Sequence, residues 1–401
     1  MASCAAASGC GGTGVAAGNK AVGNQLAIYS SLPLQGPSAQ ISQQIVDGEK
    51  LALSQAGGRV GPFKIVYSSL DDSNPAGATG QWNPGVTASD AKTAAQDTST
   101  IAYIGELDSA ATAVSLPLIN AAGIPQISPA SPYVGLVESL DAGQDEPERF
   151  YPSGQRTFAR LQPGDPVQAR AATAALTSLG VHSVYEIDDQ EAFSMPLAQL
   201  LATDATAAGI TPVGHDSLSL TLGAVYKGEA EKIAQSGADA VFFSGRGSPA
   251  AASLWRQLHE ADPHLLLLGS TAAADGPFAS QLGAASGSAY VLSPVLPPSR
   301  YPPDAQRVFA AYRRDFGEAA NGYALYGYEA MSVVLAAIRA SGARGNDRQV
   351  VTSHMLGMRD RNSVLGRYSI GPDGETTLAR YGLYRAVDGR QVFVRSISPP
   401  A

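Results

Sequence analysis

Two short segments rich in small and hydroxyl-bearing residues carry the strongest chemical signal in this chain. In the first, Ser109 follows Asp108 at the start of a predicted helix. Free backbone N–H groups and the positive end of the helix dipole favour an anion there. In the second, Ala130 and Ser131 follow the predicted strand 124–128. Ser109 could also be a plain helix N-cap, but with neighbouring hydroxyl donors the pattern is consistent with an anion site.

Strands alternating with helices must position these two segments. Strands are predicted over 25–31, 63–70, 101–105 and 124–128, and helices over 38–56, over 86–97 and after Ser109. This alternation predicts βαβ units and a parallel sheet. Open α/β sheets bind ligands beyond the carboxyl ends of their strands, which is where Ala130 and Ser131 stand. The small side chain of Ala110 would let a ligand approach the helix backbone.

A second alternating set follows residues 156–166. Its predicted helices are 166–179, 194–208, 224–236 and 249–261, and its predicted strands are 182–188, 209–218, 239–245 and 265–270. The fold class is therefore α/β, with two doubly wound α/β lobes and a crossover near 150–165.

The rest of the chain is too small to form a third lobe. It contains a predicted strand, 288–295, two helices, 304–316 and 324–341, and an alternating segment, 366–397, with two Asp-Gly turns. We expect these elements to complete the two lobes, so that the chain crosses several times and forms a multi-strand hinge. The predicted first lobe is 24–157 plus 293–356, and the predicted second lobe is 158–292 plus 357–401.

Composition narrows the class of protein further. The 401 residues are 44% hydrophobic and 15% charged, with a net charge of -8, which is typical of a globular protein and argues against a nucleic-acid surface. Both cysteines, Cys4 and Cys10, lie in the first ten residues. Residues 1–23 are expected to form a flexible tether, with Cys10 as the candidate for lipidation. A disordered tail without a lipid is the alternative.

In their order and spacing, several segments resemble the type I periplasmic binding proteins, in particular the branch that binds leucine, isoleucine and valine for ABC transporters. The segments are "LQGPSAQISQQIVDGEKLALSQAGG", "SSLDDSNPAGA", "YIGELDSAAT", "AAGIPQISPAS", "FARLQPGDPVQARA", "ALYGYEAMSVVLAAIRASG" and "GRYSIGPDGET". The resemblance runs from about residue 25 to residue 394. It implies that the two lobes close around a solute and present it to a permease.

The resemblance also implies which residues bind. The solute carboxylate would lie against Ser109, Ala110, Ala130 and Ser131 of the first lobe. The second lobe would close with Phe193, Arg246 and Thr271, and the pocket would be completed by Ile41, Tyr323 and Tyr326.

The sequence departs from the family where a solute ammonium would bind. The acidic residue expected near Thr271 is absent from "GSTAAADG". Because a buried ammonium without a partner costs several kcal/mol, either Asp275, Asp188 or Glu191 moves in, or the solute lacks an ammonium. Arg246 favours the second alternative, since a guanidinium in a cleft suits a carboxylate. It could also be a solvated loop residue.

No enzyme motif stands out. The chain has no G-x-S-x-G segment, no Walker-type loop and no cysteine pair with zinc spacing. His259 and His264 do not share a helix face, and Asp71 and Asp72 are expected to shape a turn. We therefore expect a monomeric binding protein with no enzymatic activity, cofactor or metal, located outside the cytoplasm. Its partners would be a carboxylate-bearing solute and ABC permease subunits, with a ligand-sensing module as the alternative.

Overall fold

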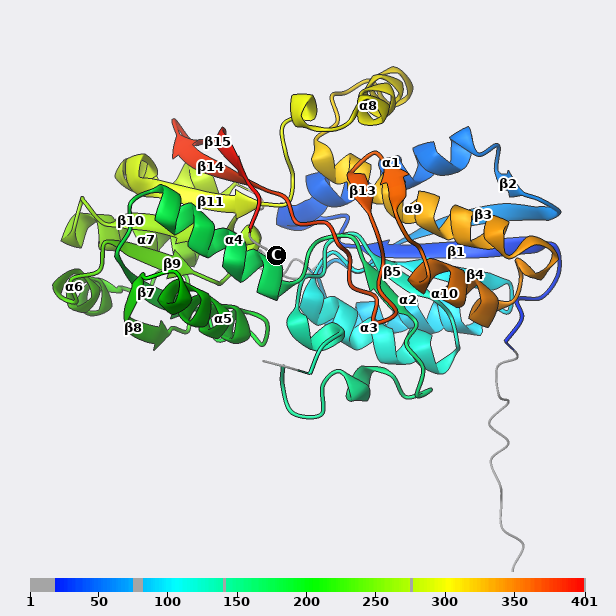
Figure 1. The fold of residues 1–401 in the computed structure, drawn as a ribbon, viewed down its shortest axis with the longest axis horizontal. Helices are drawn as coiled ribbons and strands as arrows, with labels where there is room; N and C mark the ends of the chain where they lie inside the picture. The colour runs from blue at the N-terminus through cyan, green and yellow to red at the C-terminus, as the bar shows by residue number, and fades with distance from the viewer. Residues whose placement is uncertain (1–18, 75–81, 140–141, 275–276, 400–401) are drawn as a thin grey trace, which may run out of the picture.

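The computed structural model describes residues 19–74, 82–139, 142–274 and 277–399, which form two α/β lobes side by side (Figure 1). The first lobe contains a six-stranded sheet in the order β2-β3-β1-β4-β5-β6, parallel except for the short β2. Its strands are β1 (Gln25–Leu32), β2 (Arg59–Val60), β3 (Phe63–Asp71), β4 (Thr100–Ile104), β5 (Gln126–Ser128) and β6 (Phe158–Arg160).

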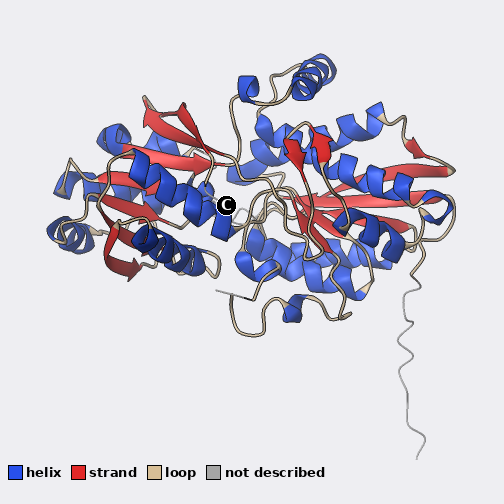
Figure 2. Cartoon of the chain, in the orientation of Figure 1, coloured by secondary structure: helices blue, strands red, loops and turns tan. Residues whose placement is uncertain are grey.

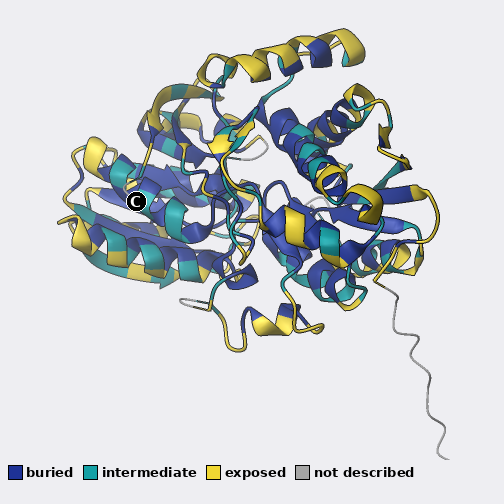
Figure 3. Cartoon of the chain, turned by 45° about the vertical axis from the view of Figure 1, so that its right-hand side comes forward, coloured by how far each residue is buried: buried dark blue, intermediate teal, exposed yellow. Residues whose placement is uncertain are grey.

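Helices cover both faces of this sheet (Figure 2). One layer contains α1 (Ala39–Gln55), α8 (Pro303–Phe316), α9 (Gly322–Ala340) and α10 (Arg348–Leu356), and the other contains α2 (Pro84–Gln96) and α3 (Ser109–Ala121). The apolar residues of the strands lie between these layers and form the core of the lobe. In Figure 3 the buried residues fill the interior of each lobe, and the exposed ones line the outer helix faces.

The second lobe contains a seven-stranded sheet in the order β15-β14-β11-β10-β9-β7-β8. Its strands are β7 (Ser183–Asp188), β8 (Thr211–Ser217), β9 (Ala240–Phe243), β10 (Leu266–Gly269), β11 (Ala289–Ser293), β14 (Tyr381–Val387) and β15 (Arg390–Ile397). One face is covered by α4 (Asp165–Ser178) and α5 (Ser194–Ala207), and the other by α6 (Lys227–Gln235) and α7 (Pro249–Ala261). The predicted α/β class with two doubly wound lobes is therefore confirmed.

The C-terminal part divides differently from the predicted boundary at residue 357. The hairpin of β12 (Arg361–Ser363) and β13 (Gly366–Tyr368) belongs to the first lobe, because Leu365 and Tyr368 of the hairpin, and Leu378 after it, lie in the core of that lobe. Only β14 and β15 join the second sheet. The chain crosses later than predicted because the sequence pattern of 366–397 does not reveal which apolar core each strand covers.

The last described residues of the predicted tether, residues 1–23, belong to the folded first lobe. Ala21 is buried, its N–H donates to the Asn346 carbonyl (2.8 Å), and the Val22 N–H donates to the Thr98 carbonyl (2.9 Å). Residues 19–22 therefore belong to the first lobe. Cys4 and Cys10 lie outside the described residues.

Three crossing segments, near residues 161–165, 294–302 and 369–380, join the lobes and bond to residues of the elements beside them. The Tyr381 hydroxyl donates to the Pro163 carbonyl (3.3 Å), and the Tyr326 hydroxyl donates to the Pro294 carbonyl (3.1 Å). The guanidinium of Arg160, fully buried at the end of β6, forms an ion pair with Glu375 of the third segment. Two of these bonds tie the first crossing segment to the third, and the Tyr326 bond ties the second segment to α9. The three segments together form the multi-strand connection between the lobes.

Candidate functional site

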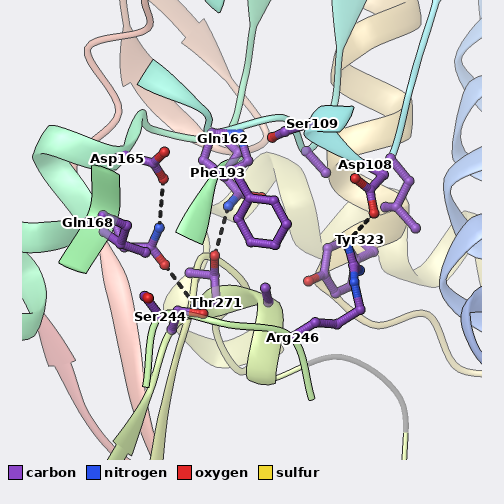
Figure 4. A pocket seen from close by; sticks show the side chains of 16 residues that line it. Asp108, Ser109, Gln162, Asp165, Gln168, Phe193, Ser244, Arg246, Thr271 and Tyr323 are labelled. Atoms are coloured by element: carbon purple, nitrogen blue, oxygen red, sulfur yellow. Dashed lines mark hydrogen bonds and ion pairs between the residues drawn. The ribbon is translucent and has the colours of Figure 1, made fainter. Parts of the chain in front are cut away.

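A cavity lies between the lobes, next to the hinge, and both lobes contribute its walls (Figure 4). Its lining comprises Leu107, Asp108, Ser109, Ala130, Pro132, Gln162, Asp165, Gln168, Phe193, Leu197, Ser244, Arg246, Ser270, Thr271, Ala272 and Tyr323. Its volume is about 40 Å³, far below the roughly 300 Å³ or more of typical ligand pockets. A solute of amino-acid size therefore requires the lobes to move apart before it can enter.

On the first lobe, the cavity meets the N-terminal turn of α3. The helix begins here because Asp108 has extended backbone angles and its carboxylate accepts from the Ala110 N–H (3.0 Å), which makes it the N-cap. The Ser109 hydroxyl oxygen accepts from the Tyr133 N–H (3.2 Å), which leaves its proton available to an acceptor in the cavity. The first turn of a helix offers N–H groups that have no intrahelical partner. Ser109 thus lines the cavity with a hydroxyl donor, and its binding of an anion stays a prediction.

The second predicted loop contributes less than expected. Ala130 lines the cavity, but its N–H donates to the Ser128 hydroxyl (3.1 Å). Ser131 is fully buried, and its hydroxyl bonds to Thr112 (2.7 Å) and Ser128 (2.9 Å). The Ser131 side chain therefore holds the loop to α3 and β5 rather than facing the cavity. Ala110 does not line the cavity either.

Three predicted residues of the second lobe reach the cavity together. Phe193 precedes α5, Arg246 follows β9 and Thr271 follows β10, so all three stand at the carboxyl ends of strands or in the loops beyond them. The guanidinium of Arg246 lies 5.7 Å from the centre of the Phe193 ring, a cation–π arrangement. Across the cavity the same guanidinium forms an ion pair with Asp108 of the first lobe (Figure 4). Arg246 is thus a cavity residue and not a solvated loop residue.

The aromatic and apolar residues that were predicted for the pocket lie in different places. Tyr323, at the start of α9, lines the cavity and also a larger opening of about 540 Å³ between the lobes. Ile41 lines only that opening. Tyr326 lies three residues further along α9, where its hydroxyl is bonded to the hinge, and it does not reach the cavity.

The three acids considered as partners for an ammonium do not line the cavity. Asp188 is fully buried and accepts from Ser217 (2.5 Å) and Gln190 (2.8 Å), with His215 2.7 Å away. Glu191 is exposed, and Asp275 lies outside the described residues. The acids that do line the cavity are Asp108 and Asp165, which the sequence analysis did not assign.

A chain of side-chain bonds that was also missed joins the hinge to the second lobe. The Gln162 amide donates to the Thr271 hydroxyl (3.2 Å), and the Thr271 N–H donates to the Gln168 side chain (2.7 Å). Gln168 in turn donates to Asp165 (3.0 Å), which also accepts from the Val134 N–H of the first lobe (3.2 Å). Burial raises the pKa of Asp165 to about 7, against the lowering effect of Arg160. This chain fixes one wall of the cavity, and the Thr271 hydroxyl accepts one of its bonds.

Two buried carboxyl groups lie behind the α3 turn. Tyr103 donates to Glu106 (2.7 Å), whose second oxygen has no partner among the described residues, and burial raises the pKa of Glu106 well above its usual value. Asp72 accepts from the Thr87 hydroxyl (3.0 Å). Burial, with the nearby charges of Asp90 and Asp108, raises the pKa of Asp72 to about 7. The interior behind the cavity therefore carries two carboxyl groups, and the described residues that bond to them, Tyr103 and Thr87, are uncharged.

We expect Asp72→Asn to flatten the dependence of stability on pH. Asp72 holds its proton up to about pH 7 when folded but loses it near 3.8 when unfolded, so the wild-type protein loses stability as pH rises between these values. The variant does not titrate there. Urea unfolding at pH 5 and pH 8 measures this difference. Between these two pH values, the free energy of unfolding of wild type should fall by about 2 kcal/mol more than that of the variant. Parallel profiles for the two proteins would contradict this, and Asp304→Asn at an exposed position is the control.

Neither a metal site nor a membrane-spanning helix is present in the part of the chain that the structure describes. Within residues 19–74, 82–139, 142–274 and 277–399, no three histidine, cysteine or acidic side chains gather in a way that could hold a metal ion. No described helix is long and apolar enough to cross a bilayer.

Comparisons with known proteins agree with this geometry. The family model for "Periplasmic binding protein" matches residues 30–391. No curated protein sequence matches the chain. A leucine binding protein, LivK, from Thermotoga maritima has the same fold, with a TM-score of 0.76, 19% identity and coverage of 93% of this chain and 99% of that one.

Two further solved structures show the same fold with different solutes. The branched-chain amino acid binding protein LivJ from Streptococcus pneumoniae, in complex with isoleucine, has a TM-score of 0.73 and 17% identity, and the match covers 94% of this chain and all of that one. A solute binding protein from R. palustris, in complex with benzoate, has a TM-score of 0.72 and 16% identity over 94% of this chain and 97% of that one. With its two lobes, its hinge and a family match over most of its length, the chain belongs to the periplasmic binding protein family.

Proposed function

We propose that this protein is the extracytoplasmic substrate-binding component of an ABC importer and that it closes its lobes around a small carboxylate-bearing solute. The main support is the cavity between the lobes, which is lined both by the donor Ser109 on the α3 turn and by Arg246 of the second lobe. These groups bring a hydroxyl proton, a helix N-terminus and a positive charge to one place. The solved structures with isoleucine and benzoate have the same fold, and both of those solutes carry a carboxylate.

The mechanism that we propose is hinge closure. The open form admits the solute through the opening lined by Ile41 and Tyr323. The α3 turn binds the carboxylate first, and Phe193 and Arg246 then approach from the second lobe. Closure expels water, which strengthens each charged contact inside the cavity. The loaded, closed form presents both lobes to permease subunits by a shift of population, and no covalent step is involved.

Isothermal titration of the purified protein tests this function directly. The panel contains branched-chain amino acids, their keto-acid analogues and benzoate, and a thermal-shift screen selects the solutes to titrate. A solute at about 100 times its dissociation constant should stabilise the protein by roughly 2.7 kcal/mol. Saturable 1:1 binding of at least one carboxylate is the expected result. If none of these carboxylates binds, the proposed function is wrong.

Ser109→Ala should weaken the binding of that solute by about tenfold, because it removes one hydrogen bond to a charged group. Titration of wild type and variant with the same carboxylate measures the change. Ser178→Ala is the control and should leave the affinity unchanged. Ser178 is the last residue of α4, at the end of that helix away from the cavity, and its hydroxyl donates to the Ala175 carbonyl (2.8 Å). Equal losses in the two variants would assign the effect to general destabilisation.

A further inference from the structure

We propose that Asp108 determines the charge of the solute: it binds the cationic group of a zwitterion whose carboxylate is held by Arg246 and Ser109, and it disfavours solutes with a negative charge alone. This inference rests on the proposed function. It assigns a specificity role to a residue that otherwise looks like a helix cap.

The first argument is the position of the Asp108 carboxylate. Its side chain is only 4% exposed and lines the cavity, where one oxygen accepts from the Ala110 N–H (3.0 Å) and the other pairs with Arg246. A carboxylate of the protein itself therefore already compensates the positive end of α3. A solute carboxylate bonded to Ser109 therefore meets that negative charge at close range, in surroundings that screen it weakly, unless the solute also carries a positive charge.

The second argument is the charge around Arg246. Its backbone N–H donates to the Asp189 carboxylate (2.8 Å), and its guanidinium pairs with Asp108. Glu191, an exposed residue, is also near: partial desolvation of its carboxyl and the charge of Asp189 raise its pKa, and Arg246 lowers it. The Arg246 guanidinium thus pairs with Asp108 and has the carboxyl groups of Asp189 and Glu191 nearby. On the opposite wall, the buried Asp165 interacts with the Arg160 guanidinium. A purely anionic solute increases this negative excess, whereas a zwitterion leaves it unchanged.

The third argument is what happens to the ion pair when a solute enters. The 40 Å³ cavity has no room for a solute beside the pair, so Asp108 and Arg246 must separate. Leaving either charge buried without a partner is costly. A zwitterion gives each a new partner, with its carboxylate on Arg246 and its cation on Asp108. A simple acid pairs with Arg246 only and leaves Asp108 facing a like charge.

The test compares solutes that differ only in the ammonium group. L-Leucine is paired with 4-methylpentanoate, and L-phenylalanine with 3-phenylpropanoate, in titrations of wild type and Asp108→Asn. Asparagine is as good an N-cap as aspartate, so α3 should remain intact. We expect wild type to prefer the amino acid of at least one pair. The variant should bind that amino acid about tenfold or more weakly and the matching acid about threefold more tightly.

Asp347→Asn is the matched control. Asp347 caps α10 through the Val350 N–H (3.3 Å) and pairs with Arg344 (3.0 Å), but it does not line the cavity. Its replacement should leave both affinities unchanged. If wild type binds a carboxylate but Asp108→Asn does not alter the ratio of the paired affinities, the role of Asp108 is wrong and the proposed function stands. If no carboxylate binds to wild type, both fail.

Discussion

Arg160→Met should lower the free energy of unfolding by about 3–5 kcal/mol, because it breaks a buried ion pair and leaves one partner uncompensated. Arg160 is fully buried, and its guanidinium pairs with Glu375 while donating to the carbonyls of Tyr133 (2.6 Å) and Ser131 (3.3 Å). Methionine fills a similar volume but satisfies none of these acceptors. Urea unfolding of wild type and variant measures the loss.

Two further variants separate the charge from the packing. Glu375→Gln alone leaves Arg160 buried without its counter-charge and should also be strongly destabilising. The double variant removes both charges, so it should be more stable than the sum of the single losses predicts. Arg307→Met is the control, since the Arg307–Asp304 pair is exposed and worth at most about 1 kcal/mol. A loss at Arg160 no larger than that of the control would contradict the prediction.

Arg160→Met should also weaken solute binding. Arg160 holds the carbonyls on either side of Pro132, which lines the cavity, and it ties that loop to the third crossing segment. Without the Arg160 side chain, the loop around Pro132 is no longer held in a fixed position at the cavity wall. One arginine therefore stabilises both the hinge and the first-lobe wall of the site.

The fold could be predicted from the sequence because its signals are local and repeated. Each strand and helix of the two alternating sets has its own hydrophobic period, and the order of the periods fixes the class. The crossing after β13 could not be predicted in this way. Leu365 and Tyr368 alternate like the residues of β14, but they join the other core, and only tertiary contacts make that choice.

Site residues could be predicted where they directly follow a strand. They were harder to predict where their role depends on a residue of the other lobe. Thr271 and Arg246 each stand in a loop after a strand and reach the cavity. Tyr323 and Tyr326 look equivalent in sequence, yet a spacing of three places only the first in the cavity. Asp108 looks like a helix cap, and its second role depends on Arg246, which lies on the other lobe. No local pattern reveals such a pair.

Gly327→Ala should destabilise the first lobe by about 3 kcal/mol, because α1 and α9 touch through their backbones. A Cβ on Gly327 would lie 2.0 Å from the Ile45 carbonyl oxygen, and one on Gly48 would lie 2.1 Å from the Ala324 carbonyl oxygen. Neither oxygen can give way, since both belong to helix backbones, so the two helices must separate. Thermal or urea unfolding measures the effect.

Gly228→Ala in α6 is the matched control for this prediction. A Cβ there would meet nothing within 4 Å, and alanine favours a helix over glycine, so this variant should gain about 0.5 kcal/mol. Glycine-to-alanine substitution is thus expected to lower the stability at Gly327 and to raise it at Gly228. A gain of stability at Gly327 would contradict the close contact between the backbones of α1 and α9. Because Tyr323 begins the same helix and lines the cavity, moving α9 should also weaken solute binding. The Gly228 variant should bind as wild type does.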